Sequence, residues 1–188
     1  MVKKYIRIVA GQYRRTPIEV IQAEGLRPTP DRVRETLFNW LSYFWGGEFS
    51  NKRVLDLFAG SGALGFEAAS RGVAHVQMVE QHPKALVALR VVRDKIGADM
   101  VRIHAGDAKV VLERLEAARF DVIFLDPPFG QDWLDFLWPK LGDLLEPHGL
   151  VYIEAEKPII MPTGYCLLRQ DRAGAVHYHL FQIAALQK

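Results

Sequence analysis

The chain has 188 residues, of which 49% are hydrophobic and one is cysteine, and its formal net charge is +2. This length suffices for one full core and is too short for two ordinary domains, and no apolar run approaches the roughly 20 residues of a membrane span. The lone Cys166 excludes an internal disulfide and a thiolate-rich zinc site. We expect it to pack as a small apolar residue in a late strand.

The first 36 residues are basic. They hold eight Lys and Arg against four acids, whereas the rest of the chain holds 16 basic and 18 acidic residues. This distribution indicates an anionic partner, with nucleic acid the first candidate, although a merely solvated face would have the same composition. The N-terminus shows no signal peptide, so we expect a cytoplasmic location. The candidate phosphate-contacting residues are Arg7, Arg14, Arg15, Arg27, Arg32 and Arg34.

Two elements are predicted before residue 45. Residues 5–21 alternate in polarity and carry Gly11 between two β-prone runs, which predicts a β-hairpin. Residues 29–44 have apolar side chains at helical spacing, which predicts an amphipathic helix with Thr29 as its N-cap and Pro30 at its first position.

From residue 52 onwards, strands and helices alternate. This order predicts an α/β fold with a doubly wound, mostly parallel seven-stranded sheet. The tail carries a DRAG turn between two strand-like runs, which predicts an antiparallel C-terminal hairpin at one edge of the sheet. The predicted strands are 53–58, 75–80, 101–105, 120–126 and 149–155, and the predicted helices are about 63–71, 83–97, 107–118 and 133–145, the last kinked by Pro139.

A glycine-rich loop joins the first of these strands to its helix. Gly60, Gly62 and Gly65 match G-x-G-x-x-G, and Glu80 lies twenty residues after Gly60, where an acid would bind ribose hydroxyls. Taken alone, these residues would also fit a nicotinamide dinucleotide site, and the glycines alone would fit a tight packing turn.

Acidic residues lie at the carboxyl ends of four successive predicted strands: Asp56, Glu80, Asp107 and Asp126. Open α/β sheets bind ligands at this edge. Asp56 could face an ammonium group, which a dinucleotide lacks, and Asp107 could accept from an adenine amino group or simply cap a helix. Together the four acids predict a nucleoside site whose ligand carries an amino acid.

The segment FLDPPFG ends a buried strand with an acid and two prolines. Proline has no N–H for a ladder, so Pro127 and Pro128 must stop the strand at Asp126. This leaves carbonyl and carboxylate acceptors beside the ring of Phe129. The candidate catalytic residues are Asp126, Pro127, Pro128 and Phe129.

These residues resemble the S-adenosylmethionine-dependent methyltransferases of the Rossmann-like class, and DPPF is similar to their amino-group methylating motif. The order RIVAG, RPTPDRVRETLFNWL, LDLFAGSGALGFEAASRG and LDPPF makes nearly the whole chain similar to the bacterial 16S rRNA guanine-N2 methyltransferase family called RsmD. The resemblance implies a class I methyltransferase fold in residues 29–188, preceded by a basic hairpin extension in residues 1–28.

The resemblance also implies the chemistry. The cofactor would be S-adenosyl-L-methionine, with no metal, and the substrate the N2 amine of a guanine in 16S rRNA, in a small subunit or an assembly intermediate. The enzyme would be a monomer. Asp126 and the Pro127 carbonyl would accept the amine hydrogens, and Phe129 would stack on the extruded base. The implied cofactor-binding residues are Asp56, Phe58, Ala59, Gly60, Gly62, Glu80, Gln81, Asp107 and Ala108.

Other functions remain open at this point. DNA adenine-N6 methyltransferases also use DPPF-type motifs, although they need a duplex-reading domain for which this chain has no room. A non-catalytic RNA-binding module with a vestigial cofactor fold is a further alternative. A dinucleotide oxidoreductase would explain neither DPPF nor the basic segment. His177 and His179 share a strand face, and without a third ligand we interpret them as packing or surface residues.

Overall fold

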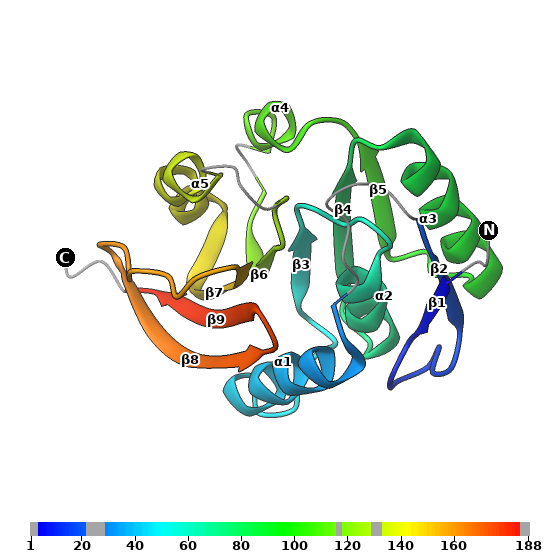
Figure 1. Cartoon of the computed structure of the whole chain (residues 1–188), viewed down its shortest axis with the longest axis horizontal. Helices are drawn as coiled ribbons and strands as arrows, with labels where there is room; N and C mark the ends of the chain where they lie inside the picture. Colours follow the sequence, from blue (N-terminus) through cyan, green and yellow to red (C-terminus); the bar gives the residue numbers. More distant parts are fainter. Residues whose placement is uncertain (1–3, 22–28, 116–117, 129–132, 185–188) are drawn as a thin grey trace.

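The structure is a computed structural model that describes residues 4–21, 29–115, 118–128 and 133–184. Its centre is a seven-stranded sheet of order β5-β4-β3-β6-β7-β9-β8, beside a two-stranded sheet of β1 and β2 (Figure 1). The strands are β1 (Lys4–Arg7), β2 (Pro17–Val20), β3 (Arg53–Asp56), β4 (His75–Glu80), β5 (Val101–Ala105), β6 (Phe120–Leu125), β7 (Leu145–Ala155), β8 (Tyr165–Ala173) and β9 (Val176–Ile183).

Strands β3 to β7 pair in parallel, and β9 pairs antiparallel with both β7 and β8. The predicted α/β fold, with its mostly parallel sheet and antiparallel C-terminal hairpin, is therefore confirmed. The helices are α1 (Asp31–Phe44), α2 (Ala63–Ser70), α3 (Pro83–Ile96), α4 (Ala108–Leu112), α5 (Trp133–Leu141) and the 3-10 turn η1 (Gly142–Leu144).

The strands alternate their side chains between two cores. On β6, Val122 and Phe124 pack with α1, α2 and α3, whereas Ile123 and Leu125 pack with α4 and α5. Burial on both faces explains why the parallel strands are continuously apolar rather than alternating. Of the described residues, none belongs to a helix long and apolar enough to cross a membrane.

The N-terminal hairpin is fixed to α2. Its connecting segment donates backbone hydrogen bonds to the buried Glu67 carboxylate, from Val9 N at 2.7 Å and Ala10 N at 3.1 Å. Gly11 has φ +79°, and a Cβ there would lie 1.9 Å from the Ser70 carbonyl oxygen, so only glycine allows this approach. Because Ile8 and Ile18 are part of the main core, the hairpin packs as a continuation of the sheet domain. A domain boundary at residue 28 stays a prediction, and it lies outside the described residues.

Three predictions about individual residues, those for Thr29, Pro30 and Cys166, are wrong. Thr29 does not cap α1, because Pro30 occupies the N-cap position with no side-chain cap. Because a proline keeps the residue before it extended, Thr29 lies one residue before the N-cap of α1. Its hydroxyl instead donates a hydrogen bond to Glu154 at 2.8 Å. Cys166 is exposed rather than packed, because β8 is the edge strand of the sheet and most of its side chains face outward.

The histidines on β9 pack as predicted. His179 is buried and its ring stacks between those of His177 and Phe181. The described part of the chain contains no group of three or more His, Cys, Asp or Glu residues that could hold a metal ion.

Candidate active site

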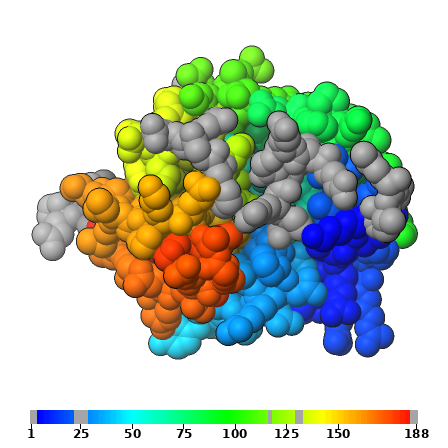
Figure 2. Space-filling view, viewed as in Figure 1, coloured from blue at the N-terminus to red at the C-terminus, as the bar shows by residue number. Residues whose placement is uncertain are grey.

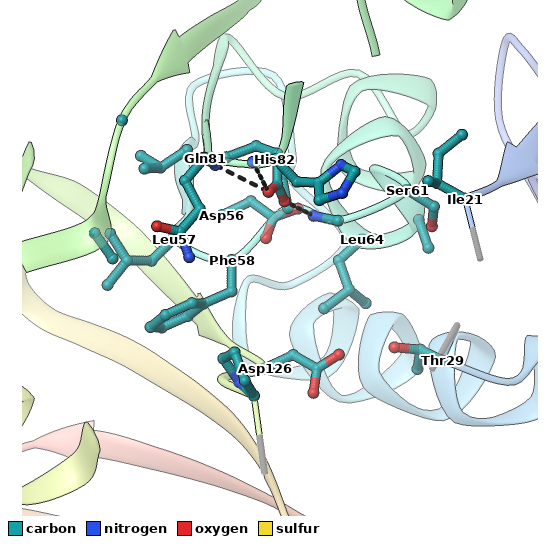
Figure 3. A pocket seen from close by; sticks show the side chains of 18 of the residues that line it. Ile21, Thr29, Asp56, Leu57, Phe58, Ser61, Leu64, Gln81, His82 and Asp126 are labelled. Carbon is teal, nitrogen blue, oxygen red and sulfur yellow. Dashed lines mark hydrogen bonds between the residues drawn. The ribbon is translucent and has the colours of Figure 1, made fainter. Parts of the chain in front are cut away.

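A pocket of about 410 Å³ opens at the carboxyl ends of β3, β4, β5 and β6 (Figure 3). In parallel sheets this edge is formed by loops, whose backbone groups are free to bind a ligand. The predicted residues that the structure brings together in the pocket wall are Asp56, Phe58, Ala59, Gly60, Glu80, Gln81, Ala108, Asp126 and Pro128.

The Glu80 carboxylate is held by backbone N–H groups. Gly60 N donates to Oε2 at 2.7 Å, and Gln81 N and His82 N donate to Oε1 at 2.9 and 2.7 Å (Figure 3). A carboxylate has about four acceptor positions, so about one remains for a ligand. Glu80 therefore both fixes the glycine loop and presents an acceptor suited to a hydroxyl.

Gly62 has a structural role at the start of α2. It is the N-cap of α2 with φ +83°, and a Cβ there would lie 2.5 Å from Leu89 Cδ2 and 2.6 Å from the Phe66 ring. Gly62 is absent from the residues that line the pocket. Its contribution is to let the loop turn into α2 against α3, and a contact with cofactor stays a prediction.

Asp56 ends β3 and is 3% exposed at the bottom of the pocket. Its Oδ2 accepts a hydrogen bond from Gly65 N at 3.0 Å. Burial, together with the negative charges of Glu80 and Glu154, raises the pKa of Asp56 to about 7 against the lowering effect of the Gly65 N–H. Such a carboxyl gains from a cationic ligand, which would return it to its ionised form.

Asp126 lies just beyond β6, which ends at Leu125, one residue before the predicted end of the strand. Its side chain projects into the pocket towards Thr29 (Figure 3). Burial raises the pKa of Asp126 well above its usual range, and the charges of Glu154 and Asp56 raise it further. No described residue hydrogen-bonds to this carboxyl, so its oxygens are available to a substrate. Pro128 lines the pocket beside it. Phe129 lies outside the described residues.

Asp107 caps a helix. Its Oδ1 accepts from Lys109 N at 2.8 Å at the start of α4. Its neighbours Gly106 and Ala108 line the pocket, whereas Asp107 does not. The capping alternative thus accounts for one of its oxygens, and a contact with adenine stays a prediction.

Sequence reasoning missed part of the site. Thr29 lines the pocket, and Glu154, 4% exposed at the end of β7, accepts hydrogen bonds from Thr29 Oγ1 at 2.8 Å and Tyr152 Oη at 3.0 Å. Trp133 lines the pocket wall and packs edge-on against Phe58 with ring centroids 4.9 Å apart. A signal for Glu154 was present, because it is a fifth acid at a strand end.

The predicted arginine contacts separate into groups. Arg34 is wrong as a phosphate contact: it is 0% exposed and donates from Nη2 to Arg7 O at 2.6 Å and Asp31 Oδ1 at 2.7 Å. The reason is helical spacing, since Arg34 shares the buried face of α1 with Leu37, Phe38 and Leu41.

Arg7 and Arg32 are exposed near the first turn of α1. Arg14 and Arg15 are exposed in the hairpin turn, whose neighbours Gln12 and Tyr13 donate to Ser70 at the far end of α2 from the glycine loop. Figure 2 shows the hairpin, in dark blue, standing at one end of the molecule beside α1. Arg27 lies outside the described residues.

The charges of the pocket define what it can hold. Asp56, Asp126 and the adjacent Glu154 are buried or enclosed carboxyls, and the nearest buried cation, Arg34, is already paired with Asp31. An excess of buried carboxyls is unfavourable unless a cation joins them. Together with the hydroxyl acceptor at Glu80 and the apolar wall, this set fits an elongated nucleoside that carries positive charge, as S-adenosyl-L-methionine does.

Comparison with known proteins agrees with this geometry. The model of the family described as Conserved hypothetical protein 95 matches residues 6–182. The chain is 37% identical to ribosomal RNA small subunit methyltransferase D of Haemophilus influenzae, covering 96% of this chain and 95% of the relative. Its Escherichia coli K12 counterpart is 36% identical, covering 94% and 89%. The solved structure of yhhF from Escherichia coli superposes with a TM-score of 0.83 at 36% identity, covering 97% of this chain and 99% of that one.

Proposed function

The chain belongs to the family described as Conserved hypothetical protein 95, and its relatives identify it as a methyltransferase; from this premise we propose that it methylates the N2 amine of a guanine in 16S ribosomal RNA. Relatives named ribosomal RNA small subunit methyltransferase D, matched over nearly their whole length, support the rRNA substrate. The observation that carries the assignment to an amine is the free Asp126 carboxyl beside the proline-terminated end of β6, in the wall of the cofactor pocket.

The methyl donor is S-adenosyl-L-methionine, whose sulfonium supplies an intrinsically reactive methyl group. Asp56 faces its ammonium group and Glu80 its ribose hydroxyls, consistent with their positions in the pocket wall. Phe58, Ala59, Gln81 and Ala108 complete the cofactor-binding surface. The fit is electrostatic first, because the ligand brings positive charge to buried carboxyls that otherwise repel one another.

The residues after β6 align the acceptor. An exocyclic amine on guanine is a poor nucleophile because its lone pair is delocalised into the ring. Asp126 and the Pro127 carbonyl accept its two hydrogens, so the nitrogen becomes pyramidal and directs its lone pair at the methyl group. This alignment of the amine with the methyl group is the protein's main contribution to catalysis. Pro128 shapes the wall beside Asp126, and Phe129 stacks on the extruded base.

The RNA backbone is bound by exposed cations outside the pocket, Arg7 and Arg32 near the first turn of α1 and Arg14 and Arg15 in the hairpin turn. Such contacts position a substrate without reading its sequence. The target guanine lies in a single-stranded loop, because a base is extruded from a loop more cheaply than from a duplex. The protein acts as a cytoplasmic monomer on a small subunit or an assembly intermediate.

The test compares methyl incorporation from labelled S-adenosyl-L-methionine into naked 16S rRNA, small subunits lacking the modification, and duplex DNA. We expect incorporation into RNA, with subunits or intermediates preferred. Deleting the N-terminal hairpin would remove Ile8 and Ile18 from the core, so a surface substitution in its turn, such as Arg14→Ala, is the suitable probe of its role. Methylation of duplex adenine would support the DNA alternative, and donor binding without transfer to any of the three substrates would support a non-catalytic module.

A further inference from the structure

Glu154 and Asp126 lie side by side at the ends of adjacent parallel strands. In the register of β6 and β7, Phe124 is opposite Tyr152 and Leu125 is opposite Ile153, and Asp126 and Glu154 directly follow this last pair in the two segments. Neighbouring strands are about 4.8 Å apart, and paired residues of a parallel sheet point to the same face. Both carboxyls therefore lie on the face of the sheet covered by α1, the face on which Phe124 and Tyr152 pack.

Glu154 is the better fixed of the two. Its Oε1 accepts from the hydroxyls of Thr29 and Tyr152, and the buried Arg34 attracts it, whereas no described residue donates to Asp126. Burial raises the pKa of Glu154, and the two hydroxyl donors and the Arg34 charge oppose this rise, because hydrogen-bond donors and a nearby cation favour an ionised carboxylate. When the two neighbouring carboxyls share one proton, that proton is therefore bound to Asp126, the carboxyl that faces the pocket.

The charged groups on the elements packed around Asp126 and Glu154 agree with a protonated Asp126 and an ionised Glu154. The charged and titratable groups near the pair are Asp56 on β3, Arg34 on α1, Glu67 on α2, Tyr152 on β7 and Tyr178 on β9. Arg34 is the only cation in this set; although it is paired with Asp31, its charge also acts on Glu154.

Resting on the proposed function, we propose that Glu154, held by Thr29 and Tyr152 one strand away from Asp126, is a positioning residue whose buried negative charge makes Asp126 the proton acceptor of the reaction. With the cationic donor in the pocket, the repulsion between the two carboxylates is balanced and Asp126 is ionised, ready to accept hydrogen bonds from the guanine amine. Glu154 itself touches neither donor nor substrate.

Proton transfer to Asp126 follows methyl transfer. The N2 lone pair forms the N–CH₃ bond while the S–CH₃ bond breaks and leaves its electron pair on sulfur, which converts the sulfonium to a neutral thioether. The amine, now carrying an extra bond, releases its proton to the Asp126 carboxylate. Because the balancing positive charge has disappeared, the ionised Glu154 again favours a proton on Asp126 and drives this transfer.

The direct test needs no catalysis. In protein without ligands, the Asp126 carboxyl is titrated by ¹³C NMR with labelled aspartate, its signal assigned by Asp126→Asn. Removing the neighbouring charge with Glu154→Gln should lower the titration midpoint of Asp126 by at least about one pH unit. Glu156→Gln, which changes an exposed acid two residues further along the chain, should leave it unchanged. If the titration midpoint of Asp126 is the same in Glu154→Gln as in the parent protein, the proposal is overturned.

The second readout separates positioning from a structural role. In single-turnover methylation at saturating donor, Glu154→Gln should move the acidic limb of the pH–rate profile to lower pH, with donor affinity within about threefold of the parent value. A rate that falls by one factor at every pH would instead indicate a structural role and contradict the proposal. Tyr152→Phe, which keeps the ring and removes one donor to Glu154, should shift both readouts the same way by less, and it replaces Glu154→Gln if that variant does not fold.

The outcomes also separate this inference from the proposed function. A midpoint that responds to Glu154→Gln in a protein that methylates no RNA contradicts the function and leaves the coupling of the two carboxyls standing. An unresponsive midpoint in an active enzyme overturns the coupling and leaves the function standing.

Discussion

Two parts of this molecule bury carboxyl groups, and they treat them in opposite ways. Glu67, beneath the N-terminal hairpin, receives hydrogen bonds from Val9 N, Ala10 N and Arg71 Nε. Asp126, in the pocket, receives none from the described residues, and Asp56 receives one. A fully paired buried carboxylate serves the fold, whereas a poorly paired one is costly and is retained where a ligand completes it. The contrast separates Glu67 from Asp56 and Asp126, whereas Glu80, with three backbone donors and a place in the pocket wall, combines both roles.

The largest expected effect is on catalysis. Asp126→Ala removes the side chain that aligns the amine and takes its proton, so methyl transfer should fall by about 10²–10⁴-fold or more. Donor affinity should change little, because Asp126 acts mainly in the transition state. Single-turnover rates and calorimetric donor binding measure the two effects. Near-normal turnover would remove Asp126 from the mechanism.

Substitution of the structural acid Glu67 should reduce the stability of the fold. Glu67→Ala leaves two backbone N–H groups and Arg71 without their acceptor, so the free energy of unfolding should fall by about 3 kcal/mol or more. Urea unfolding measures the loss, with Glu35→Ala on the exposed face of α1 as the control. If Glu67→Ala were as stable as the control, the hairpin would not depend on this carboxylate.

A smaller effect is expected on cofactor binding. Asp56→Ala should weaken donor affinity by about 1.5–3 kcal/mol, the usual contribution of a hydrogen bond to a charged group. Because the raised pKa of Asp56 is about 7, the group is protonated below that pH and must lose its proton to face an ammonium. Donor affinity should therefore decrease by up to about tenfold per unit as pH falls below 7 and level off above it. Calorimetry across pH 5.5–8.5 tests this, and an affinity that is independent of pH in the parent would contradict it.

The smallest expected effect concerns the RNA surface. Arg32→Ala should weaken rRNA binding a few-fold and reduce the magnitude of the salt slope by about 1, as the loss of one phosphate contact does. Arg93→Ala on α3, which is partly exposed and already paired with Asp94, serves as the control. Equal effects of both substitutions would show that binding does not favour the first turn of α1.

The pattern of agreement between sequence and structure has a physical basis. The end of β6 was predictable because an apolar run and two prolines are local signals, and the same holds for the acids at the ends of β3 and β4. The bond between Thr29 and Glu154 joins residues 125 positions apart and depends on how α1 lies over β7, so no local pattern encodes it.

Arg34 shows the reverse case. A charged residue is usually exposed, and the prediction followed that rule. Helical spacing placed it on the apolar face of α1, and its paired Asp31 together with the Arg7 carbonyl made that burial possible. Composition indicated a basic surface, but only periodicity could indicate which of its arginines are unavailable to RNA.

The central claim is tested most directly by identifying the methylated nucleoside. Small subunits from cells that lack this protein are incubated with it and labelled S-adenosyl-L-methionine, and the rRNA is digested and mapped by mass spectrometry. The account predicts one N2-methylguanosine in a single-stranded loop of 16S rRNA, absent when Asp126→Ala is used. A methyl group on adenine, on a ring nitrogen of guanine or on ribose would contradict it.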